Sequence, residues 1–98
     1  MAELGKYEEV AALLKALGHP ARLCIVHGLL EGPCNVGTIK DCLGLPQSTI
    51  SQHLMVLRAA GIVEGVRRGT EIRYHVRDER VRVLLETMLP FLPVSPRR

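Results

Sequence analysis

The sequence contains very few aromatic residues: one phenylalanine, two tyrosines and no tryptophan among 98 residues. A hydrophobic core must therefore be built from Leu, Val, Ile and Ala, which favours packed helices. With 47% hydrophobic residues, the chain can form one small core but is too short for a roomy active-site cleft. We expect a single, mainly helical domain spanning residues 1–98, and we do not expect an enzyme.

The sequence also lacks any apolar run that approaches the ~18 residues needed for a membrane-spanning helix. Its first residues, MAELGKYEE, carry acidic side chains where a secretory signal would carry basic ones. These absences predict a cytoplasmic protein without a membrane partner. The three cysteines, an odd number, argue against a disulfide framework and leave core packing, metal binding or thiol chemistry as their roles.

Charge is missing from one face of the helix predicted over residues 47–60. Ile50, Leu54 and Leu57 recur at helical spacing and must face a core. The opposite face carries small polar side chains that can donate and accept hydrogen bonds toward base edges, and we assign base reading to Ser48, Thr49, Ser51 and Gln52. A short helix over residues 38–43, capped by Thr38, precedes it. Gly44 and Pro46 supply the turn between the two helices, so residues 36–60 predict a helix-turn-helix.

Positive charge is concentrated directly after this helix. Residues 62–77 carry four arginines against two glutamates, whereas residues 1–37 carry more acidic than basic side chains. Arginines beside a recognition helix suit contacts to DNA phosphates. The predicted phosphate-contacting residues are Thr38, Gln47, His53, Arg67, Arg68 and Arg73.

The remaining periodicities complete the order helix, helix, helix, helix, strand, strand, helix. Helices are predicted over residues 6–18 and 20–32, a hairpin over 62–76 that turns at Arg68 and Gly69, and a last helix over 78–89. Gly65 predicts a bulge or a close backbone approach. Residues 93–98 are Pro-rich and predict a disordered tail. The last helix has more apolar residues than one small core needs, which predicts a second copy of the chain.

Several residue runs resemble the ArsR/SmtB family of small bacterial repressors over residues 8–90. The most specific are PARL at 20–23, QSTISQHLMVLRAAGIV at 47–63 and the basic hairpin ending in RYHV at 73–76. The resemblance implies a mainly α fold with a small β-hairpin, the winged helix-turn-helix, and binding to double-stranded operator DNA. It also implies homodimers formed through the first and last helices, whose interface residues would be Tyr7, Val10, Leu14, Leu84, Leu85 and Met88.

The resemblance does not identify an inducer. Members that bind metal in the recognition domain often carry ELCVCDL where this chain has PCNVGTI, so Asn35 and Gly37 replace the two cysteines. Members that bind zinc on the last helix use an Asp and a His near its start, where this chain has Asp78 and Arg80. Persulfide-sensing members pair a cysteine of the second helix with one of the last helix, which has none here.

The cysteines and histidines leave several roles open. Cys24 and His27 are spaced to share a metal ion, although burial of Cys24 in an apolar helix is the favoured alternative. Cys34, which we expect to be exposed on a loop, and Cys42, near the end of the short helix that follows, are the candidate sensing thiols, for an oxidant or a metalloid such as arsenite; the alternative is that both are incidental. His53 either packs or contacts phosphate.

The leading hypothesis is a homodimeric, sequence-specific transcriptional repressor that a thiol-reactive or redox signal releases from its operator. A metal- or metalloid-sensing repressor with cysteine and histidine ligands is the first alternative, and a metal or metalloid ion is the only cofactor we consider. A winged helix that serves only protein contacts is the rival from another class. The uncharged helix face and the neighbouring arginines argue against that rival.

Overall fold

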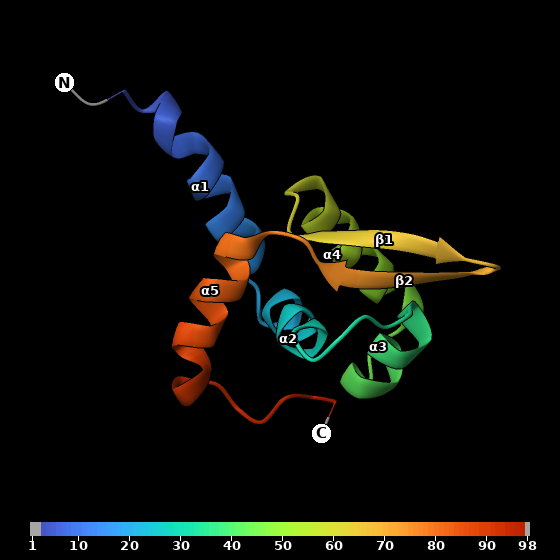
Figure 1. Ribbon diagram of the computed structural model, residues 1–98. Coiled ribbons are helices and arrows are strands. Elements are labelled where there is room, and N and C mark those ends of the chain that lie inside the picture. Colours follow the sequence, from blue (N-terminus) through green and yellow to red (C-terminus); the bar gives the residue numbers. More distant parts are fainter. Residues whose placement is uncertain (1–2, 98) are drawn as a thin grey trace.

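A computed structural model describes residues 3–97 and has the predicted order of elements (Figure 1). The observed elements are α1 (Gly5–Leu17), α2 (Pro20–Leu29), α3 (Val36–Leu43), α4 (Gln47–Ala59), β1 (Val63–Arg68), β2 (Glu71–Val76), α5 (Glu79–Met88) and a short 3-10 turn, η1 (Leu89–Phe91). In Figure 1, α2 lies in the middle of the molecule, while the hairpin projects on one side and α1 on the other. The mainly α fold with a small hairpin is confirmed.

The turn between α3 and α4 follows the predicted chemistry, but the start of α3 does not. Gly44 adopts a left-handed φ of 68° and ends α3 by donating its N–H to the carbonyl of Lys40. The helix begins two residues earlier than predicted because Asn35, and not Thr38, is the capping residue. The Asn35 side-chain oxygen accepts a hydrogen bond from the Thr38 N–H at 2.8 Å. The prediction that Thr38 caps α3 is therefore wrong.

The hairpin is a regular two-stranded antiparallel ladder from Val63↔Val76 to Arg68↔Glu71. Its loop consists of Gly69 and Thr70, one residue later than predicted, and Gly69 takes a positive φ of 64°. No bulge occurs at Gly65. A Cβ there would lie 2.8 Å from the Ile72 side chain, so Gly65 marks the close approach that was the other prediction.

The core lies where α2, α4 and the base of the hairpin meet. Its fully buried side chains are aliphatic: Ile25, Val26, Leu29, Ile50, Leu54, Leu57, Ile62 and Val81. Burial of each such side chain contributes about 1.5–3 kcal/mol relative to exposure. The core therefore holds α4 by its apolar stripe and leaves its other face open. No helix within residues 3–97 is long and apolar enough to cross a membrane.

The end of the chain folds back onto α2 instead of fraying as predicted. Asp78 caps α5 by accepting the Arg80 N–H at 2.9 Å, and α5 ends at Met88 before η1. Beyond η1, Ser95 is buried, and the Arg97 guanidinium donates to the carbonyl of Gly32 at the C-terminal end of α2. The hydrogen bond from Arg97 to the Gly32 carbonyl holds residues 93–97 against the end of α2. Arg98 lies outside the described residues.

Candidate nucleic-acid interface

Helix α4 presents the face that was assigned to base reading. Ile50, Leu54 and Leu57 are buried. Ser48, Ser51 and Gln52 are exposed on the other side, and Thr49 is half-buried between the two faces. Ser48, Thr49, Ser51 and Gln52 carry no charge, so each can approach base edges without the cost of removing an ion from water. The prediction that the whole face lacks charge is wrong, because Arg58 is exposed in the last turn of α4, seven residues after Ser51 and therefore on the same side of the helix.

The arginines of the hairpin differ in how available their charges are. Arg67 and Arg68 are exposed on β1, and neither forms an ion pair with any residue from 3 to 97. Arg73 on β2 instead lies 3.1 Å from the carboxylate of Glu71. The guanidinium groups of Arg67 and Arg68 are therefore unpaired within the described chain, whereas the charge of Arg73 is partly neutralised.

The hairpin is tied to the helix-turn-helix through residues 34 and 35. Cys34 and Tyr74 exchange two backbone hydrogen bonds, of 3.1 and 2.8 Å. The Asn35 amide donates to Glu71 at 2.8 Å, and this bond, with a second from Arg73, lowers the pKa of the Glu71 carboxyl. One residue, Asn35, thus caps α3 and contacts β2. Sequence reasoning missed this role, although an Asn just before a helix is a readable capping signal.

The other three predicted phosphate-contacting residues have different settings. Gln47 is exposed at the first position of α4, and Thr38 is half-buried in the first turn of α3. The His53 ring is half-buried against the ring of His19, with their centroids 4.6 Å apart. Burial, His19 and Arg22 all lower the pKa of His53. This setting favours the packing role of His53 over phosphate contact.

The structure contradicts the expected exposure of the cysteines. Cys34 is buried, with 7% of its surface exposed, because its backbone pairs with β2. Burial raises its pKa, which opposes formation of a reactive thiolate. Cys24, expected to be fully buried, is half-buried, as is Cys42. The prediction that Cys34 is an exposed loop thiol and Cys24 an inaccessible one is therefore wrong.

The pairing of Cys24 with His27 as metal ligands gains no support. His27 is buried beside a cavity. Within residues 3–97, no three His, Cys, Asp or Glu side chains come together in a group that could hold a metal ion.

An apolar surface extends over α1 and α5, which an ion pair between Glu9 and Arg80 joins at 3.3 Å. Five of the six predicted interface residues are between 37% and 63% exposed, namely Tyr7, Val10, Leu14, Leu84 and Met88. Leu85 is only 2% exposed and belongs to the core of the single chain, because it lies on the inner face of α5. Its assignment to an interface is wrong. Val83, which the prediction omitted, is exposed on the same helix.

A helix-turn-helix whose second helix exposes uncharged polar side chains, followed by a basic hairpin, defines a winged helix-turn-helix DNA-binding protein. A sequence profile described as "Bacterial regulatory protein, arsR family" matches residues 19–65. The biofilm growth-associated repressor of Agrobacterium fabrum is 42% identical over 82% of this chain and 68% of its own length. The chain belongs to the ArsR family.

Solved structures of similar proteins have the same fold. The transcriptional repressor BigR from Xylella fastidiosa superposes with a TM-score of 0.81 at 38% identity, covering 93% of this chain and 94% of BigR. The homodimeric winged helix-turn-helix domain of Mb0332 from Mycobacterium bovis, a possible ArsR-family regulator, superposes with a TM-score of 0.79 at 28% identity, covering 92% and 88%. The chain is thus a DNA-binding transcriptional repressor of the ArsR type, and its named relatives are regulators and not enzymes.

Proposed function

We propose that two copies of the chain bind one operator, each placing α4 in the major groove of a half-site. Within α4, Ser48, Ser51 and Gln52 contact base edges, with Thr49 at the margin of the contact. Arg67 and Arg68 bind phosphates beside the groove. The observation that carries the proposal is the group of exposed, uncharged polar side chains on α4, next to two arginines that form no ion pair in the described chain.

The homodimer that we propose is formed by the apolar surface of α1 and α5. Tyr7, Val10, Leu14, Leu84 and Met88 on this surface would otherwise remain in water. The Mb0332 structure is a homodimer of the same fold, which supports this assignment. A two-fold dimer requires half-sites separated by about one turn of DNA, roughly 34–36 Å. We place this activity in the cytoplasm, where operator DNA is found.

The test begins with selection of a bound sequence from random double-stranded DNA, followed by affinity measurements at several salt concentrations. Gln52→Ala should weaken binding to the selected sequence by about 1–3 kcal/mol and change binding to random DNA much less, because only a base contact is lost. If Gln52→Ala lowers the affinity for both DNAs equally, Gln52 does not contact a base.

The hairpin arginines are tested in the same assay. Arg67→Ala and Arg68→Ala should each weaken binding to both DNAs and reduce the slope of log affinity against log salt by about one. Lys6→Ala is the matched control, since it removes one positive charge from the far end of α1 and should leave the slope unchanged. A wing that serves only protein contacts would show no salt-dependent DNA affinity at all.

A further inference from the structure

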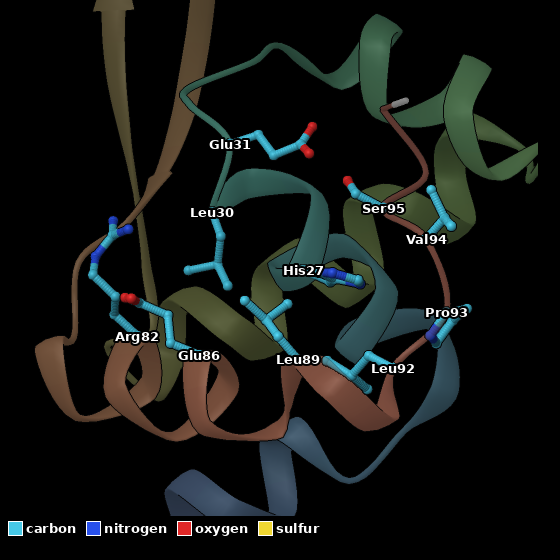
Figure 2. A pocket seen from close by; sticks show the side chains of 10 residues that line it. All are labelled: His27, Leu30, Glu31, Arg82, Glu86, Leu89, Leu92, Pro93, Val94 and Ser95. Carbon is cyan, nitrogen blue, oxygen red and sulfur yellow. The ribbon is translucent and has the colours of Figure 1, made fainter.

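A cavity of about 520 Å³ lies between α2, α5 and the C-terminal segment (Figure 2). This volume falls within the range of about 300–1,000 Å³ that small-molecule sites occupy. The cavity is separate from the α4 face proposed to meet DNA, and the residues that line it come from α2 and the turn after it, from α5 and from the segment that follows α5.

The His27 ring lines this cavity while almost the whole residue is buried, with 7% of its surface exposed. It forms no hydrogen bond with any of residues 3–97. A neutral imidazole offers one donor and one acceptor, on nitrogens that point in different directions. No buried side-chain nitrogen or oxygen among residues 3–97 lacks a partner, so the unpaired nitrogens of His27 are accessible from the cavity. A ligand group in the cavity can form a hydrogen bond with one of them.

The other surroundings of the cavity limit the charge of a ligand. Leu30, Leu89 and Leu92 supply apolar walls. Two carboxylates, Glu31 and Glu86, and one guanidinium, Arg82, also line the cavity. The Arg82 guanidinium lies 3.9 Å from Glu79 of its own helix, whereas Glu86 has no ion pair within the described chain. An anion would therefore meet an uncompensated carboxylate, while the guanidinium charge is already shared.

The C-terminal segment closes one side of the cavity. Arg97 donates to the carbonyls of Gly28 and Gly32 at the C-terminal end of α2, where a positive charge is favoured. Gly28 allows this approach, because a Cβ on it would lie 3.3 Å from Pro96. The wall formed by residues 93–95 depends on these contacts.

We propose that this cavity binds a small, uncharged, mainly apolar molecule with one hydroxyl group, which forms a hydrogen bond with His27. Bound there, the molecule contacts both α2, which packs against α4, and α5, which carries the apolar dimer surface. An effect on operator affinity rests on the proposed function, but binding itself does not, because it is measured without DNA.

The experiment uses three probes that share one ring system: 1-naphthol, naphthalene and 1-naphthoate. Since the chain has no tryptophan, naphthyl fluorescence reports binding directly. We expect 1-naphthol to bind about three- to tenfold more tightly than naphthalene, as one added hydrogen bond allows. 1-Naphthoate should bind at least tenfold more weakly than 1-naphthol. Equal affinity for 1-naphthol and naphthalene, or no binding of 1-naphthol at millimolar concentration, would overturn the proposal.

Variants locate the site. His27→Phe keeps a ring in place and should abolish the preference for 1-naphthol over naphthalene, whereas His75→Ala on the hairpin should preserve it. Leu92→Phe should weaken both probes by filling part of the cavity without adding a tryptophan, and Arg97→Ala should weaken both equally by releasing the wall. Should His27→Phe fail to fold, the Leu92→Phe and Arg97→Ala results decide. Probe binding that none of these changes affects lies elsewhere, for example on the apolar surface of α1 and α5, and refutes the assignment.

Discussion

Replacing Asn35 separates the two contacts that its side chain makes. Its oxygen caps α3 through the Thr38 N–H at 2.8 Å, and its amide donates to the Glu71 carboxylate at 2.8 Å. Asn35→Ala removes both contacts, whereas Asn35→Asp keeps an equally good capping oxygen but loses the donor. Loss of the cap alone costs about 1 kcal/mol, within a range of roughly 0.5–2 kcal/mol. For a domain of this size, each kcal/mol lowers Tm by about 4–8 °C.

Urea denaturation followed by circular dichroism measures these differences. All variants are compared at one protein concentration, so that any stabilisation by self-association is held as nearly constant as the variants allow. Both variants lose the contact with Glu71, and the Asp variant also gains a repulsion from the half-buried Glu71 carboxylate. At pH 7, Asn35→Ala should therefore be less stable than Asn35→Asp by the value of the cap less this repulsion. If the two variants are equally destabilised, or Asn35→Asp is the less stable, capping is not the main contribution of Asn35.

The contact with Glu71 predicts a dependence on pH. The pKa of Glu71 is lowered first by the Asn35 hydrogen bond and then by Arg73. A lowered pKa gives stability that is present above the unfolded value, about 4.3, and is lost as the pH falls through the folded value. The stability difference between the parent and Asn35→Ala should therefore narrow toward pH 3. In a Glu71→Gln background, it should not change over this interval.

The elements and the recognition helix could be predicted from the sequence because local signals determine them. Ile50, Leu54 and Leu57 fix which side of α4 is buried, and that choice leaves the polar residues on the other side. Gly44 ends α3 as predicted, with a left-handed φ of 68°. Periodicity, turn chemistry and packing agree here, which is the condition under which sequence reasoning succeeds.

Exposure that depends on contacts far apart in the chain could not be predicted in the same way. Cys34 looks like a loop thiol by its neighbours, yet it pairs with Tyr74, forty residues later. Leu85 belongs to the same apolar set as Leu84, but the two lie about 100° apart around α5, and only Leu85 faces the core. The composition of residues 93–98 predicts disorder, but in the structure Arg97 donates hydrogen bonds to the carbonyls of Gly28 and Gly32. In each case, the deciding neighbour lies outside the local window.

The difference in exposure between Leu84 and Leu85 yields a paired prediction. Leu84→Glu should give folded monomers when the protein is measured by sedimentation. Leu85→Ala should instead lower the free energy of unfolding by about 2–5 kcal/mol, because Leu85 is only 2% exposed in a single chain. A Leu84→Glu protein that stays dimeric would move the interface elsewhere. The cysteines yield the second prediction, by labelling with iodoacetamide and mass spectrometry. Cys24 and Cys42, both half-buried, should react before Cys34, because a reagent reaches the Cys34 sulfur only after the segment opens from β2. Burial also raises the pKa of Cys34 and lowers its thiolate fraction at neutral pH. Its labelling rate should rise under mild urea as this segment opens, and rapid labelling of Cys34 in the native protein would refute the pairing with Tyr74.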